Sequence, residues 1–591
     1  MWAGIYSFVS GANSNEGEIA NTQLEANLSP TSRGHSPRST QFAPFARIGV
    51  DVLGLILGYL DVCALPVLDS ALCNKASRAN FHQALQRVES GPLLLESMLV
   101  SSSHRWEAVF AWMCTRGISA PASLDLPSGY SNETMRIISK CTTLHNILKV
   151  NIPERGRRRR GGGGGGGGVF LSQKAMKVFS RFSSLQNFES MGNKISNERL
   201  KCLVGLPIEM LNLCGAQLLT DRAMKHIALL TSLRELTICH VPVGDEGLLV
   251  LSHGCRSLES LTFSSEFVTD TGFRSLGDPA SPLAKTLKKL RIGDLLAVTN
   301  EGIKALLGLA ALESLALSCN EESSVTGACC EHVAGFPRLS ELALGLRNLS
   351  DVHLRPLSSC SRLVRLRLLS SSVTGGGLSH LGGASRLVDV EVASDSLTAD
   401  GLQSLRYLPQ LESFSLVSYT ALQSDELHLS VLVNLKHLSI CGNRDTQTIG
   451  ALSNATIARL GELKKLESLK LYWCENIDGR ALLELSARCP SLKKIGVFGC
   501  QGVSRPQMQE LGGRGVSVDY SDSYDDDDDD DSDDNDDSDD DSDPDAYHYQ
   551  DSEGNPTEFP FVNGDEGEDE GDDDDDDEDD YQGSSGDVAL W

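Results

Sequence analysis

Apolar residues recur along most of this chain with the spacing Leu-x-x-Leu-x-Leu. The clearest copy is Leu233, Leu236 and Ile238, and the same frame returns eleven more times between residues 208 and 497, mostly at steps of 24 to 27 residues. Alternate residues of a strand point to opposite faces, so the leucines are expected to turn inward and the residues between them outward. A unit this short cannot bury its own apolar face, so the pattern predicts a solenoid of stacked units.

This period and pattern are typical of leucine-rich repeats. Each unit is expected to add one parallel strand to a concave face and one helix to a convex face, which predicts an α/β solenoid. Polar pairs such as Thr269-Asp270 and Thr299-Asn300 precede the helical runs, where their side chains can cap free N–H groups. With two weaker repeats, around Leu124 and at Leu144-His-Asn-Ile147, about 15 repeats are expected over residues 116–518.

An Arg- and Gly-rich run interrupts the array at residues 154–168. Leu144 and Leu185 are 41 residues apart, and taking out these 15 residues restores a spacing of 26. We therefore interpret the run as an insertion between the strand and the helix of one repeat. A flexible loop and a nuclear-import or nucleic-acid patch are the alternative interpretations.

Charge is divided unevenly along the chain. Residues 519–591 contain 36 Asp and Glu and no Lys or Arg, whereas residues 1–518 contain 52 Lys and Arg against 45 Asp and Glu. Like charges repel and few apolar residues offset chain entropy, so we expect the tail to be disordered, like the Ser- and Asn-rich residues 1–43. The tail is either solubilising or a binder of basic partners such as histones.

The 16 cysteines follow the repeat. Cys255, Cys360 and Cys489 stand three residues before the first leucine of a unit, a position that leucine or phenylalanine occupies in other units. No Cys-x-x-Cys pair occurs, so we predict core thiols and expect neither a metal nor another cofactor. Reduced buried thiols indicate a cytoplasmic or nuclear protein, and no membrane segment is expected.

Residues 44–115 precede the array and are apolar at helical spacing. The segments Ile56-Leu57-Gly58-Tyr59-Leu60-Asp61 and Leu68-Asp-Ser-Ala-Leu72-Cys-Asn-Lys75 resemble an F-box, although Ile48-Gly49 stands where that module opens with Leu-Pro. Cys441, Cys474 and Cys500, just past strand leucines, resemble the cysteine-containing, ribonuclease-inhibitor-like repeats of F-box leucine-rich-repeat proteins. A helical cap that seals the solenoid is the alternative interpretation of residues 44–115.

The F-box resemblance implies a substrate receptor of an SCF-type, cullin-based ubiquitin ligase. Its adaptor-binding residues would be Leu53, Ile56, Leu57, Leu60, Leu68 and Leu72, and an unidentified target protein would bind the repeats. The chain also resembles leucine-rich nuclear proteins that carry an acidic tail. That resemblance implies a scaffold protein with no link to a ubiquitin ligase. No nucleophile, P-loop or metal motif is present, so we expect no enzymatic activity. We also expect no nucleic-acid partner.

Candidate partner-binding residues lie at outward strand positions of the concave face. They are Lys289, Arg291, Arg365, Arg367, Lys470, Tyr472, Trp473, Lys494 and Phe498. Charged residues are common on the solvent-exposed face of a strand, and by themselves they do not indicate binding. Aromatic rings beside cations, as in the last two repeats, are typical of interaction hot spots.

Overall fold

The computed structural model describes residues 148–152, 173–192, 195–319, 323–346, 348–394, 396–417, 429–442, 452–474 and 476–521, with short strands at 123–125, 549–550 and 556–557. The expected F-box-like module at 44–115, with Leu53, Ile56, Leu57, Leu60, Leu68 and Leu72, lies outside the described residues. The N-terminal residues 1–43, the insertion at 154–168 and most of the acidic tail lie outside them as well.

Sixteen strands form one sheet in chain order, and each strand is parallel to the next. The α/β leucine-rich-repeat solenoid predicted from the spacing is therefore confirmed. The strands are β1 (Ser123–Asp125), β2 (Lys149–Ile152), β3 (Asn187–Ser190), β4 (Met210–Asn212), β5 (Glu235–Cys239), β6 (Ser260–Ser264), β7 (Lys289–Gly293), β8 (Ser314–Ser318), β9 (Glu341–Gly345), β10 (Arg365–Ser371), β11 (Asp389–Ser394), β12 (Ser413–Val417), β13 (His437–Cys441), β14 (Ser468–Tyr472), β15 (Lys494–Phe498) and β16 (Ser517–Ser521).

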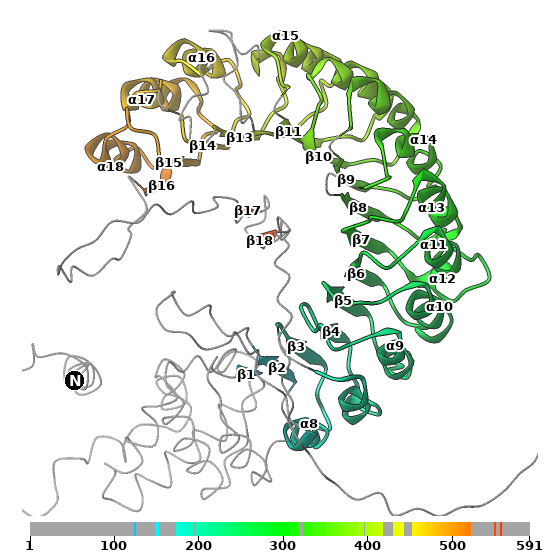
Figure 1. The fold of residues 1–591 in the computed structure, drawn as a ribbon. Coiled ribbons are helices and arrows are strands. Elements are labelled where there is room, and N and C mark those ends of the chain that lie inside the picture. The colour runs from blue at the N-terminus through cyan, green and yellow to red at the C-terminus, as the bar shows by residue number, and fades with distance from the viewer. Residues whose placement is uncertain are drawn as a thin grey trace, which may run out of the picture. The chain divides into compact units, whose positions relative to one another are not determined.

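Helices follow the strands on the outer side of the curved sheet (Figure 1). The α-helices are α8 (Gln173–Phe179), α9 (Asp221–Ile227), α10 (Asp245–Gly254), α11 (Asp270–Leu276), α12 (Leu283–Thr286), α13 (Asn300–Ala305), α14 (Cys330–Val333), α15 (Ala399–Leu402), α16 (Asn454–Leu460), α17 (Gly479–Arg488) and α18 (Arg505–Gly513). The 3-10 helices are η3 (Asn197–Leu203), η4 (Leu306–Gly308), η5 (Gly327–Cys329), η6 (Asp351–Ser359), η7 (Gly376–Gly383), η8 (Gln403–Tyr407) and η9 (Leu429–Val431). Pro356 inside η6 and the glycines of η7 disfavour an α-helix there.

The leucine frame forms a continuous core between the sheet and the helices. Leu261, Leu290 and Leu315 occupy the same register position on β6, β7 and β8, and all three are buried. The residues between the leucines alternate outward, as in the exposed-buried-exposed-buried pattern of β7. Stacking identical positions in this way lets each repeat bury the apolar side of its neighbours.

Thr269 and Thr299 cap the helices that follow them, as predicted. The backbone N–H of Thr271 donates to Thr269 Oγ1 at 3.1 Å, and that of Glu301 donates to Thr299 Oγ1 at 3.2 Å. The residue after each of these threonines, Asp270 or Asn300, also reaches the next repeat, which the sequence did not indicate, and Asp245 does the same one repeat earlier. Asp245 accepts hydrogen bonds from Thr269 N (2.8 Å), Thr269 Oγ1 (2.6 Å) and Gly272 N (2.9 Å).

The same contact between repeats recurs along the array. Asp270 accepts from Thr299 N and Thr299 Oγ1, both at 2.8 Å, and Asn300 accepts from Thr326 N at 3.0 Å. Gly272 makes room for the carboxylate, because a Cβ atom there would lie 2.5 Å from Asp245 Oδ1. These polar bridges hold the helix starts at Thr269, Thr299 and Thr326 to the repeat before them.

The edges of the array differ in detail from the sequence frame. β2 pairs Val150 with Phe188, so its strand lies three residues beyond the Leu144–Ile147 frame that the sequence suggested, because Ile147, Val150 and Ile152 fit the same apolar spacing. β16 extends to Ser521, across the expected end of the solenoid at residue 518. Its Tyr520 hydroxyl donates to the Val503 carbonyl at 3.0 Å.

The predicted core thiols are confirmed. Cys255, Cys360 and Cys489 are buried, and the cysteines of the described residues are free thiols. In the part of the chain that the structure describes, no three His, Cys, Asp or Glu residues are placed to hold a metal ion. None of the described helices has the length and apolar character needed to cross a membrane.

In residues 525–591 the structure describes the antiparallel pair β17 (Tyr549–Gln550) and β18 (Pro556–Thr557).

Candidate partner-binding face

The inner face of the sheet carries the outward residues of each strand, in register from one repeat to the next. Lys289 and Arg291 of β7 stand beside Ser314 and Ala316 of β8, and Arg365 of β10 stands beside Glu341 of β9. Side chains at these positions are therefore neighbours across strands about 4.8 Å apart. The nine predicted partner-binding residues all belong to this face or to the turn that follows it.

Three of the six predicted cations form ion pairs with acids on a neighbouring strand. Arg365 pairs with Glu341, which is directly opposite it. Arg367 Nε lies 3.2 Å from Glu391 Oε2, also directly opposite. Lys494 Nζ lies 2.7 Å from Asp519 Oδ2 on β16. These cations are already neutralised within the array.

The other three cations, Lys289, Arg291 and Lys470, have no acidic partner among the described residues. Their in-register neighbours explain why: Ser260 and Ser314 flank Lys289, Thr262 and Ala316 flank Arg291, and Ser439 and Gly496 flank Lys470. None of these neighbours carries a charge. The six cations looked alike in the sequence, and the structure separates them into three with an acidic partner and three without one among the described residues.

Two aromatic rings form a platform at the C-terminal end of this face. Tyr472 of β14 and Phe498 of β15 are paired in register, and their rings stack with centroids 4.9 Å apart and planes 11° apart. Both side chains are half-buried. Burial, with smaller contributions from Cys441 and Asp519, raises the pKa of the Tyr472 hydroxyl, so that group stays neutral and can donate a hydrogen bond.

Trp473 extends this platform from the turn after β14. It has a left-handed backbone with φ of 57°, and Gly499 has φ of 63° in the equivalent turn after β15. A Cβ atom on Gly499 would lie 2.3 Å from Trp473 Cε3, so the indole packs directly over this glycine. Gly499 is required here both for its backbone conformation and for the close approach of the indole.

Lys470 borders the platform. A Cβ atom on Gly496 would lie 3.5 Å from Lys470 Cγ and 3.1 Å from Phe498 Cε2, so the lysine stem and the phenylalanine ring both approach this glycine. An apolar platform beside an unpaired ammonium group suits a partner side chain that has an apolar body and a polar or anionic tip.

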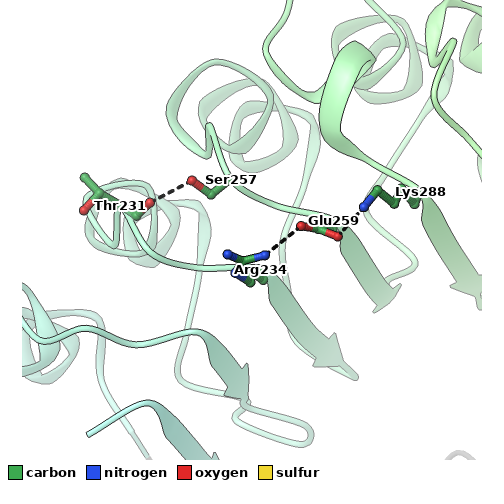
Figure 2. Close-up of polar contacts among 5 residues, drawn as sticks. All are labelled: Thr231, Arg234, Ser257, Glu259 and Lys288. Carbon is green, nitrogen blue, oxygen red and sulfur yellow. Dashed lines mark hydrogen bonds and ion pairs between the residues drawn. The ribbon is translucent and has the colours of Figure 1, made fainter. Parts of the chain in front are cut away.

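A second row of charged residues stands immediately before strands β5, β6 and β7. Figure 2 shows the Glu259 carboxylate between Arg234 and Lys288, with distances of 3.0 Å to Arg234 Nη1 and 2.6 Å to Lys288 Nζ. The two cations lower the pKa of Glu259, Lys288 most strongly through its hydrogen bond. Ser257 Oγ donates to the Thr231 carbonyl at 3.0 Å and adds a further link between repeats.

The acids Glu259, Glu391 and Asp519 shape this face but were not singled out from the sequence. Glu391 is mostly buried, and burial raises its pKa despite the opposing effect of Arg367. Placing the outward residues of adjacent repeats side by side would have exposed the Arg367–Glu391 pair. Asp519 could not be found in this way, because the sequence frame ended at residue 518.

No protein-family model matches this chain, and no curated protein matches it. Among solved structures, it is similar to an internalin from Listeria monocytogenes, with 18% identity over 55% of this chain and 88% of the other and a TM-score of 0.35. It is also similar to a chain in the Rad7–Elc1 complex in yeast, with 17% identity over 59% and 87% and a TM-score of 0.38. A leucine-rich-repeat protein of Leptospira interrogans aligns at 14% identity over 69% and 98%, with a TM-score of 0.34.

Proposed function

We propose that this chain is a non-catalytic recognition protein whose inner face binds a protein partner, with the Tyr472–Phe498 platform as the anchor. The observation that carries the proposal is that stacked, half-buried pair beside the unpaired Lys470. Interface hot spots are enriched in tyrosine and tryptophan, which combine a large apolar area with a polar group. The neighbouring Trp473 supplies a third aromatic ring in the same region.

The anchor is tested by truncating the phenylalanine. Proteins captured from a cell extract by the full chain are quantified by mass spectrometry and compared with those captured by Phe498→Ala. Tyr407→Ala is the matched control, because Tyr407 ends η8 and is 51% exposed. We expect at least one partner to fall about tenfold or more with Phe498→Ala, which corresponds to a hot-spot residue, and to be unchanged with the control. Equal capture by both variants would refute the anchor.

We further propose that residues 45–90 attach the chain to the adaptor of a cullin-type ubiquitin ligase, so that the inner face presents the target for ubiquitination. The support is the F-box resemblance of Leu53, Ile56, Leu57 and Leu60, together with the order of an F-box-like segment followed by a recognition solenoid. Leucine and isoleucine side chains at helical spacing are what a docking helix places in a partner's groove.

Two variants separate the two binding roles. Calorimetry with purified adaptor should show binding by the full chain and by Phe498→Ala, but not by Leu57→Glu. Target capture should show the reverse, with Leu57→Glu retained and Phe498→Ala lost. If the unaltered chain does not bind the adaptor at micromolar concentration, residues 45–90 are a cap of the solenoid and the ligase role is wrong.

The charge of the acidic tail favours a second candidate function, a scaffold that binds basic proteins without a ligase. Residues 525–591, which begin where the compact repeat unit ends, hold most of the 36 acidic residues of the tail. A binder that depends on the tail loses its partners when residues 525–591 are deleted, and its affinity falls steeply with salt. A ligase receptor keeps its adaptor and its target after the same deletion.

A further inference from the structure

We propose that Lys289 and Arg291 bind two acidic side chains spaced two residues apart in an extended segment of the partner protein. This inference rests on the proposed function, because it names the chemistry of a segment bound to the same face. It concerns β7, seven strands before the aromatic platform. The cation pair would therefore read a different part of the partner from the part that the platform binds.

The first step of the argument is the free charge of the two side chains. Lys289 and Arg291 are exposed and have no acidic partner in the described part of the chain, whereas the adjacent Lys288 is held by Glu259 (Figure 2). Surface cations without a partner keep their full charge for an incoming anion. Lys288 is paired with Glu259, so the cations without an acidic partner lie on the inner face of β7.

The second step concerns the short side chains on either side of the two cations. Ser260 and Ser314 lie on either side of Lys289, and Thr262 and Ala316 lie on either side of Arg291. These side chains are short, so the lysine and the arginine stand above them. The hydroxyl groups can donate further hydrogen bonds to an anion that comes down to the sheet.

The third step concerns the acids that lie around the pair. Across the sheet, Glu235 lies on β5 and Glu341 on β9, four strand spacings or about 19 Å apart. Along β7, Glu259 lies near the start of the strand and Asp294 directly follows its end. Glu259 and Glu341 are themselves paired with cations, whereas Glu235 and Asp294 have no Lys or Arg partner among the described residues. A short anionic group at the two cations stays clear of these two carboxylates, whereas a long polyanion such as RNA that runs past them would be repelled.

The fourth step is the spacing of the cations. Residues two apart on a strand project from the same face about 6.6 Å apart, which is the separation of Lys289 and Arg291 along β7. An extended partner segment has the same geometry, so acids at positions x and x+2 face the two cations together. Adjacent acids project to opposite sides, and only one of them reaches the pair.

The experiment uses the full chain and short fluorescent peptide libraries with fixed centres of Glu-x-Glu, Glu-Glu or phosphoserine, and with uncharged random flanks. Binding is measured by anisotropy at about 0.15 M salt. We expect Glu-x-Glu peptides to bind about two- to fivefold more tightly than Glu-Glu peptides, because the second ion pair is exposed. The K289Q/R291Q variant should lose this preference. The K225Q/R274Q variant, which removes two exposed cations from α9 and α11, should keep it.

Three results would overturn the inference. They are no preference for Glu-x-Glu, a preference that survives K289Q/R291Q, and tighter binding of phosphoserine peptides or of a single-stranded RNA oligomer than of Glu-x-Glu. The Phe498→Ala variant keeps the two proposals apart, since it should retain the peptide preference while losing the captured partner. If partner capture depends on Phe498 but the peptide preference is absent, only the inference about β7 fails.

Discussion

Replacing Gly272 by alanine tests whether the repeats are joined by their aspartates. An added Cβ atom would lie 2.5 Å from Asp245 Oδ1 and 3.2 Å from the side chains of Leu248 and Val268. The carboxylate would have to move away from the backbone N–H groups of Thr269 and Gly272, from which it accepts hydrogen bonds of 2.8 and 2.9 Å. Losing two hydrogen bonds to a charged group costs about 3–6 kcal/mol, and the better helix propensity of alanine returns about 1 kcal/mol.

The expected result is therefore a net loss of about 2–5 kcal/mol in the free energy of unfolding. Urea unfolding followed by circular dichroism measures it, and hydrogen exchange over residues 245–276 localises it. Gly512→Ala is the control, because Gly512 lies in α18 and an added Cβ would meet nothing within 4 Å. That change should stabilise the chain by about 0.5–1 kcal/mol.

A double-mutant cycle separates the clash from any other effect of the methyl group. In an Asp245→Ala background the carboxylate is absent, so Gly272→Ala should cost little or should stabilise the chain. The coupling between the two changes should be at least about 1 kcal/mol, as expected for residues in direct contact. The same loss in both backgrounds would refute the idea that Gly272 exists to admit the carboxylate of the preceding repeat.

Four further predictions concern other parts of the chain. Cys255, whose pKa burial raises to about 12, should resist alkylation in the native protein and react after unfolding, as mass spectrometry would show. Gly499→Ala should displace Trp473, change its fluorescence and weaken capture of the partner that depends on the platform. Because the pKa of Glu259 is lowered in the folded protein, its ion pairs stabilise the fold above the ordinary carboxyl pKa, and this stabilisation is lost as the pH falls through the lowered value. Glu259→Gln should therefore reduce the free energy of unfolding by less than about 1 kcal/mol at neutral pH and by almost nothing in acid, as urea unfolding would measure. Deleting residues 525–591 should leave the urea midpoint of the repeats unchanged but abolish the capture of basic proteins, if the tail binds them.

The strand frame could be predicted from the sequence because one signal dominates it. The leucine spacing places Leu261 and Leu290 inward, and a shift of one residue would expose every leucine of a strand, so few alternatives compete. Where the leucine spacing is less regular, the predicted strand position was wrong. β2 lies three residues beyond the predicted motif, because Ile147 fits the apolar spacing both as the second position after Leu144 and as the first position before Val150.

The binding face could be predicted less completely, because its properties depend on neighbours from other repeats. Lys470 and Lys494 look equivalent in the sequence. The structure shows that Lys494 forms an ion pair with Asp519 on β16, diagonally across from it, while Lys470 stands between Ser439 and Gly496. Likewise, Gly272 looks like a weak point of its own helix until the carboxylate of the previous repeat is seen beside it. The role of residues 45–90 stays a prediction.

The bridging aspartates also give the array a direction. Asp245 and Asp270 each belong to one repeat but support the helix start of the following repeat, so support passes from the N-terminal side to the C-terminal side. If the last repeat frays, the repeat before it still has its own support, and the fraying can stop there. If an early repeat opens, the next one loses its anchor, and the damage can spread. Under mechanical load this protein should therefore tolerate being pulled from its C-terminal end better than from its N-terminal end.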